Sequence, residues 1–169
     1  MRLLVKYFEM TVPPAGSALL SPDKDAIVAR ECLSREEYLA LYKAIGDPVQ
    51  WDERFRIEPA ELNRMLSSEF LEVFILRISG KAVGLCEFDK RKFPDIELVN
   101  YGLLTSFQGR GLGVYLLDQS LRKVWNCCPN RVWLHTDTND HPRAALTYER
   151  AGFKEYISRY EDFPDELAR

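Results

Sequence analysis

Three glycines that alternate with other residues, in Gln108-Gly109-Arg110-Gly111-Leu112-Gly113, constrain this chain more than any other feature. The segment before them, residues 96–104, has the pattern of a strand, and a helix is expected from the glycines to about Trp125. Glycine lets main-chain amides approach an anion closely, and the free amides and dipole of a helix start favour negative charge. The sequence therefore predicts a phosphate-bearing ligand at this junction between a strand and a helix.

Two common phosphate-binding patterns do not fit this segment. A P-loop ends in Gly-Lys-Ser/Thr, whereas Gly111 is followed here by Leu112. A dinucleotide-binding loop needs a glycine at the position that Val114 occupies. Asp137 lies near the position of a ribose-binding acid, so a nucleotide-dependent enzyme remains as a weaker alternative.

The sequence predicts a single domain over residues 1–169. Ser34 and Glu37 form a capping box at the start of one helix, and Gly46 ends that helix. Further helices are expected at residues 59–67 and 142–151, and further strands at residues 3–10, 26–32, 70–79, 81–89, 131–137 and 153–160. This order of elements describes an α/β sandwich with a mixed sheet.

Charge and composition argue against several other classes of protein. The chain has 23 basic and 26 acidic residues, a net charge of −3, which is unusual for a nucleic-acid-binding protein. The two histidines, His135 and His141, and the four cysteines form no metal-binding pattern, and we interpret the cysteines as reduced thiols. No run approaches the roughly 18 apolar residues of a membrane span, and no targeting signal is evident. We therefore expect a cytoplasmic protein without a metal site.

A second motif supports the first. The segment Arg143-Ala144-Ala145-Leu146-Thr147-Tyr148-Glu149-Arg150-Ala151-Gly152-Phe153 resembles the Ala-x-x-x-Tyr-x-x-x-Gly-Phe helix of the GNAT superfamily of acetyl-CoA-dependent N-acyltransferases. The glycine segment at 108–113 matches the Gln/Arg-x-x-Gly-x-Gly/Ala signature of the same superfamily. The resemblance implies a mixed, mostly antiparallel sheet flanked by helices. In this fold the strands at 96–104 and 131–137 splay apart, and the thioester lies in the gap between them.

The resemblance also implies how acetyl-CoA, as co-substrate, would be held. Its pyrophosphate would bind the amides of residues 108–113, and the backbone of Leu103 and Leu104 would pair with the pantetheine arm. The family usually has an asparagine seven residues before the tyrosine, where this chain has His141. Asn139 stands two residues earlier, and either side chain is a candidate for contact with the pantetheine arm.

Glu97 and Tyr148 are the candidate catalytic residues. An amine acceptor arrives mostly as ammonium and must lose a proton, and Glu97 occupies the position of the general base in members of the family that have one. Apolar neighbours on its strand, Val99 and Leu103, are expected to raise its pKa. A solvent-facing glutamate and a water chain as base are the alternatives. Tyr148 can protonate the departing thiolate, although tyrosines at this spacing commonly pack in a core.

Four further residues are candidates for roles on the acceptor side of the site. His135 is an alternative base that Asp137 would orient, or a structural histidine. Tyr42, Trp51 and Arg54 are candidates for the acceptor pocket, although packing is the more common role of the two rings.

The sequence thus predicts an N-acetyltransferase that acts on a small-molecule or peptide amine, as a monomer or homodimer without nucleic-acid or membrane partners. The alternative is a CoA-binding sensor or interaction module without turnover.

Overall fold

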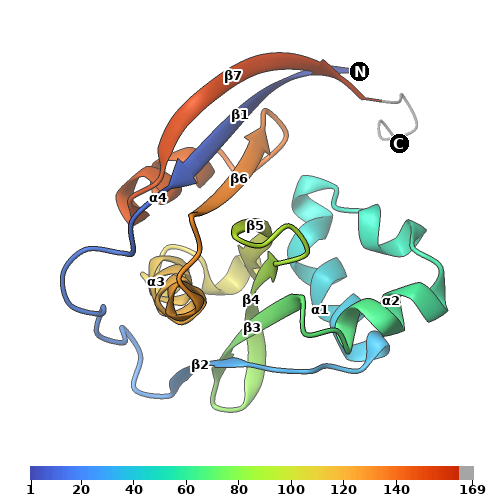
Figure 1. Cartoon of the computed structure of the whole chain (residues 1–169). Coiled ribbons are helices and arrows are strands. Elements are labelled where there is room, and N and C mark those ends of the chain that lie inside the picture. The colour runs from blue at the N-terminus through green and yellow to red at the C-terminus, as the bar shows by residue number, and fades with distance from the viewer. Residues whose placement is uncertain (164–169) are drawn as a thin grey trace.

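The computed structural model describes residues 1–163 and contains one seven-stranded sheet with helices on both faces (Figure 1). The strands are β1 (Arg2–Met10), β2 (Ala26–Arg30), β3 (Leu71–Ile78), β4 (Lys81–Asp89), β5 (Asp95–Leu103), β6 (Arg131–Asp137) and β7 (Lys154–Asp162). The α-helices are α1 (Arg35–Gly46), α2 (Pro59–Leu66), α3 (Leu112–Val124) and α4 (Ala144–Ala151), and the short 3₁₀ helices are η1 (Asp47–Val49), η2 (Glu53–Arg56), η3 (Thr105–Phe107) and η4 (Trp125–Cys127). These elements agree closely with those predicted from the sequence.

The strand order is β2-β3-β4-β5-β6-β1-β7, and every neighbouring pair is antiparallel except β5 with β6. Those two strands are parallel, and they pair only between Asp95–Glu97 and Arg131–Trp133. Beyond these residues β5 continues beside β4, while β6 continues beside β1. The mixed, mostly antiparallel sheet and the splayed central strands are therefore confirmed.

Strand β1 lies between β6 and β7, a position that the sequence did not predict. In Figure 1 it forms a long curved ribbon with β7. Its register places Tyr7 opposite His135 on one side and Ile157 on the other. The N-terminal strand thus contributes side chains to the region around β6, far from it in sequence.

Two apolar cores cover the two faces of the sheet. Helices α3 and α4 pack on one face, where the fully buried Leu116, Leu117 and Leu121 of α3 anchor the larger core. Helices α1 and α2 pack on the other face, where α1 buries the stripe that its sequence predicts: Tyr38, Leu41, Tyr42 and Ile45. The predicted capping box is present, since the Ser34 side chain accepts from the amide of Glu37 and the Glu37 carboxylate accepts from that of Ser34. The gap between β5 and β6 therefore opens between two helical layers.

Candidate active site

The glycine segment forms a row of free main-chain amides at the start of α3. Gly109 and Gly111 have φ angles of +74° and +77°, in the left-handed region that glycine tolerates best. Gly111 caps α3 without any side-chain hydrogen bond. Among residues 1–163, none accepts a hydrogen bond from an amide between Gly109 and Val114. This arrangement can bind an anion through several amides at once.

Gly113 serves a different purpose, because its backbone is helical. A Cβ atom at this position would lie 2.9 Å from the hydroxyl oxygen of Tyr101 on β5. Glycine here therefore lets α3 approach β5 closely. The third glycine of the motif is required by packing rather than by backbone conformation.

The free edge of β5 faces the gap. Beyond Glu97, the side of β5 that turns toward β6 has no strand partner. Leu104 differs from the prediction, because its amide donates to Val83 O and its carbonyl accepts from the amide of Phe107, both at 2.9 Å. The carbonyl of Leu103 accepts from Gln108 Nε2 at 3.4 Å. The edge that can pair with an extended ligand therefore lies mainly before Leu104.

Glu97 lies at the point where β5 and β6 part, on the face covered by α1 and α2. A bulge at Val99 shifts the alternation of β5, so Glu97 shares its face with Asn100, whereas Leu103 lies on the other face. The expectation that Leu103 is an apolar neighbour of Glu97 is therefore wrong. The register partner of Glu97 on β6 is Trp133.

His135 pairs with Glu97 and not with Asp137. Its Nδ1 lies 3.6 Å from Glu97 Oε1, and this interaction raises the pKa of His135, although burial opposes the shift. The Asp137 carboxylate instead accepts a hydrogen bond from the amide of Asn139 at 2.7 Å. The predicted orientation of His135 by Asp137 is thus corrected to a pair of side chains that spans the two splayed strands.

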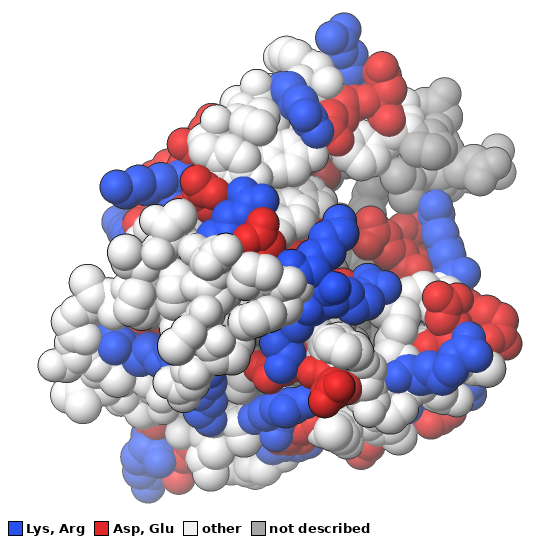
Figure 2. All heavy atoms as spheres, in the orientation of Figure 1, with Lys and Arg blue, Asp and Glu red and all other residues white. Residues whose placement is uncertain are grey.

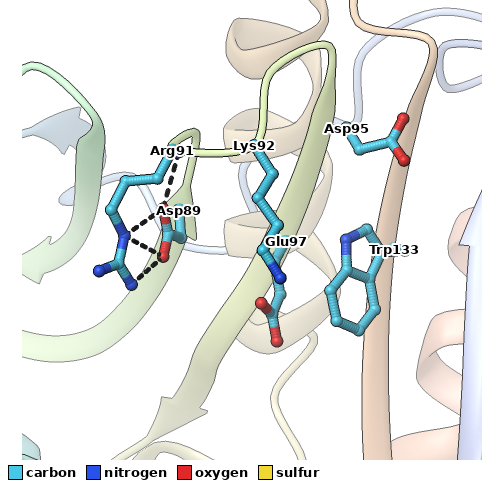
Figure 3. A pocket seen from close by; sticks show the side chains of 6 residues that line it. All are labelled: Asp89, Arg91, Lys92, Asp95, Glu97 and Trp133. Carbon is cyan, nitrogen blue, oxygen red and sulfur yellow. Dashed lines mark hydrogen bonds and ion pairs between the residues drawn. The ribbon is translucent and has the colours of Figure 1, made fainter.

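A hollow of about 300 Å³ gives access to Glu97 from solvent (Figure 3). Glu97 and Trp133 line it from β5 and β6, and Asp95 lies at its upper rim in the view. Arg91 is bound to Asp89, 2.5 Å away, on the other side of the hollow. Lys92 extends toward Glu97 in the picture, but no ion pair joins them.

Tyr148 lies on the face of the sheet opposite to that of Glu97. Its ring packs within 5.9–6.2 Å of the ring centroids of Tyr101, Phe8 and Phe153. Burial raises its pKa well above the usual value. No residue within 1–163 forms a hydrogen bond with its hydroxyl. The ring is thus a core ring, as one interpretation predicted, and its hydroxyl is available to a ligand.

The turn before α4 carries the two candidates for contact with the pantetheine arm, and both are exposed. His141 Nδ1 accepts from the amide of Arg143 at 3.2 Å, so the neutral ring carries its proton on Nε2, where it can donate. The side-chain amide of Asn139 makes no hydrogen bond with residues 1–163. The structure brings both residues to the end of β6.

Asp140 belongs to the same turn and was not recognised from the sequence. Its carboxylate accepts from the hydroxyl of Thr136 at 2.5 Å and from the amide of Asp137 at 3.2 Å, and burial raises its pKa. It borders a second hollow of about 250 Å³ together with His141. The only signal for it in the sequence is a carboxylate three residues after the end of β6.

Arg54 and Tyr42 do not line an acceptor pocket. The buried Glu87 of β4 forms an ion pair with Arg54 and accepts from the hydroxyl of Tyr38 at 2.5 Å and from Asn100 Nδ2 at 3.2 Å. Tyr42 is 1% exposed, and burial raises its pKa to about 12. Trp51 packs on the Tyr42 ring, with 5.3 Å between centroids. The polar network fixes η2 to the sheet beside the site.

Comparison with known proteins now identifies the fold. The sequence matches the acetyltransferase (GNAT) family over residues 34–153. The chain belongs to the GNAT acetyltransferase family. No curated protein sequence matches it at a significant level.

Solved structures share this GNAT fold at low sequence identity. A GCN5-related N-acetyltransferase from Sphaerobacter thermophilus superposes with a TM-score of 0.69 and 20% identity, over 94% of this chain and 50% of the other. A functionally unknown conserved protein from Staphylococcus epidermidis superposes with a TM-score of 0.65 and 19% identity, over 95% of this chain and 60% of the other. An aminoglycoside acetyltransferase from a soil metagenomic sample superposes with a TM-score of 0.62 and 15% identity, over 77% of this chain and 88% of the other. This chain therefore spans only half to three fifths of the first two structures.

Two other types of site are not found in the part of the chain that the structure describes. Within residues 1–163, no group of three or more His, Cys, Asp or Glu side chains is arranged to hold a metal ion. No helix in the same range has both the length and the apolar character that a membrane span requires.

Proposed function

We propose that this GNAT protein transfers an acetyl group from acetyl-CoA to a primary amine. The observation that carries the proposal is the row of free amides from Gly109 to Val114, directly beside the splayed edge of β5. These amides fit a pyrophosphate, and the free edge of β5 fits an extended pantetheine arm. Acetyl-CoA supplies the activated acetyl group as a co-substrate.

Positive side chains near the amides support an anionic ligand. The Arg110 guanidinium lies 5.3 Å from the centroid of the Phe107 ring, and Lys81 Nζ lies 5.7 Å from the same ring. Arg110 also forms an ion pair with Asp23 at 3.8 Å, whereas Lys81 forms no ion pair within residues 1–163. Figure 2 shows Lys and Arg side chains among Asp and Glu side chains on one face of the molecule.

Glu97 and Tyr148 then divide the proton transfers between the two faces of the sheet. The Glu97 carboxylate takes a proton from the acceptor ammonium, so that the neutral nitrogen attacks the thioester carbonyl. The C–S bond breaks, and the Tyr148 hydroxyl gives its proton to the departing thiolate. The attacking nitrogen loses its second proton to solvent as the amide forms, and solvent returns a proton to the Tyr148 phenolate. A main-chain amide near Leu103 is the candidate donor to the oxyanion.

The pantetheine arm has two candidate side-chain donors, Asn139 and His141. The amide of Asn139 has no other partner within residues 1–163, and the Nε2 proton of His141 points away from the bond that its Nδ1 makes. Substitution of each by alanine identifies the donor, because the true one weakens CoA binding and the other leaves it unchanged.

Calorimetric binding of CoA combined with thiol release from acetyl-CoA tests the proposal. With a primary amine as acceptor, Glu97→Gln is expected to lower kcat by about 10²–10⁴-fold and to leave the Kd for CoA unchanged. Tyr148→Phe is expected to lower kcat with the same unchanged Kd. An absence of CoA binding at millimolar concentration would overturn the proposal. Binding without turnover of any amine would favour the non-catalytic CoA-binding module instead.

A further inference from the structure

A row of three rings borders the gap on the face that carries Glu97. The rings of Trp133, His135 and Tyr7 lie with 5.8–6.4 Å between centroids and 21–37° between planes. The His135 side chain is 48% exposed. Since Trp133 is the register partner of Glu97, the ring row begins directly beside that carboxylate. The exposed ring of His135 and the partly exposed rings of Tyr7 and Trp133 thus lie together at the mouth of the gap.

Among residues 1–163, no Lys or Arg forms an ion pair with Glu97, although Arg91 and Lys92 line the same hollow. Arg159 is bound to Glu161 at 2.7 Å, and Arg131 to Glu9 at 3.0 Å. Glu97 is paired only with His135 among residues 1–163. A carboxylate in this position, next to aromatic faces, attracts a cation.

The ring row already holds one cation at its far end. The Arg159 guanidinium lies 5.0 Å from the centroid of the Tyr7 ring, while the hydroxyl of Tyr7 donates to Glu161 at 2.7 Å. A ring with a carboxylate at its edge thus holds a cation at Tyr7. Trp133 and Glu97 offer the same combination nearer the gap, and no cation of residues 1–163 lies over the Trp133 ring.

We infer that this ring row receives the acceptor, and that the acceptor carries a primary ammonium on a flat apolar face or on a short arm beside one. This inference rests on the proposed function, because it places the ammonium at Glu97. The flat face stacks on Trp133, where a flexible alkyl chain would gain less because it loses more conformational entropy. Such a face can be an aromatic ring or the C–H face of an aminosugar.

Direct binding to the CoA-saturated protein tests the acceptor class without turnover. Four probes separate its parts: phenethylamine and glucosamine carry both ammonium and flat face, hexylamine lacks the flat face, and phenethyl alcohol lacks the charge. At least one of the first two is expected to bind about fivefold or more tightly than the last two, which is the order expected for a cation–π contact. The better of the two shows which flat face the site prefers.

Variants locate the binding surface. Trp133→Leu is expected to lower the affinity for the preferred ring amine about five- to tenfold. Trp133→Phe is expected to retain most of the wild-type affinity. Tyr160→Leu is the matched control, because Tyr160 is an exposed ring of β7 on the other face, opposite Leu4. Glu97→Gln is expected to lower the affinity for phenethylamine and to leave the affinity for phenethyl alcohol unchanged. Melting temperatures of all variants check that the fold is retained.

The outcomes separate this inference from the proposed function. Equal affinity for hexylamine and both ring amines, or equal effects of Trp133→Leu and Tyr160→Leu, would overturn the inference while the transfer reaction stands. Selective binding of ring amines without any acetylation would support the inference and overturn the proposed function. If CoA does not bind, the same four probes are compared on the free protein.

Discussion

On the face of α3 and α4, the gap between β5 and β6 is bordered by main-chain amides, whereas on the face of α1 and α2 it is bordered by charged and aromatic side chains. The first face offers the amides of Gly109 to Val114 and the open edge of β5. The second offers Glu97, His135 and Trp133.

This difference separates a constant from a variable part of the site. Main-chain groups persist when side chains change, so they suit a ligand that is the same for every member of a family. Side chains at β6 and β1 can change without loss of the fold, so they suit the selection of an acceptor. The two faces should therefore respond independently to substitution, and the following predictions test that independence.

The largest effect is expected from the buried ion pair behind the side-chain face. Arg54→Met leaves Glu87, which is 0% exposed, without its cation, and should lower the free energy of unfolding by about 3–5 kcal/mol. Urea unfolding measures this loss, and Arg54→Met with Glu87→Leu should recover much of it. Asp47→Ala, which breaks an exposed pair with Lys43 at 2.7 Å, serves as the control and should cost at most about 1 kcal/mol. CoA affinity of the folded Arg54→Met protein should be unchanged, and a marked loss would show that the faces are coupled.

A smaller effect is expected from the glycines of the main-chain face. Gly111→Ala must hold a φ of +77° and should lower the free energy of unfolding by about 1–2 kcal/mol. Gly16→Ala is the matched control, with a φ of +69° and open space around its Cβ position. Both variants should lose similar stability, but only Gly111→Ala should weaken CoA binding, about tenfold or more if hydrogen bonds to phosphate are lost. Equal CoA affinity in calorimetry for the two variants would contradict the role of the loop.

The smallest effect concerns the pair of Glu97 and His135. Because Glu97 raises the pKa of His135, Glu97→Gln should lower it, whereas Asp137→Asn should change it much less. The raised pKa stabilises the fold below the usual imidazole pKa, and this contribution is lost as the pH rises through the raised value. Glu97→Gln should therefore destabilise the protein more at about pH 5.5 than at about pH 8. Titration of the two imidazoles by NMR measures the shift. If Asp137→Asn lowers the pKa of His135 and Glu97→Gln does not, Asp137 is the partner of His135, as the sequence predicted.

Part of the site was predictable because its signals are local. Glycines at 109 and 111 indicate left-handed backbone before a helix. The capping box is predicted by Ser34 and by Glu37, three residues later. Glu97, Tyr148 and the turn at 139–141 were named from motifs that lie within single elements. Their partners were not predictable in the same way, as the assignment of His135 to Asp137 illustrates.

By itself, the sequence determined which segments form strands and helices, and that free main-chain amides lie at the start of α3. Only the tertiary structure decided which side chains meet across the gap. The bulge at Val99 reverses which β5 residues share a face with Glu97, and strand β1 inserts between β6 and β7 to bring Tyr7 to His135. Both depend on strand pairing between distant segments, where a shift of one residue turns every side chain to the other face. Hydrophobic alternation along one segment carries no information about its partner, so the ring row and the Arg54–Glu87 pair emerged only from the fold.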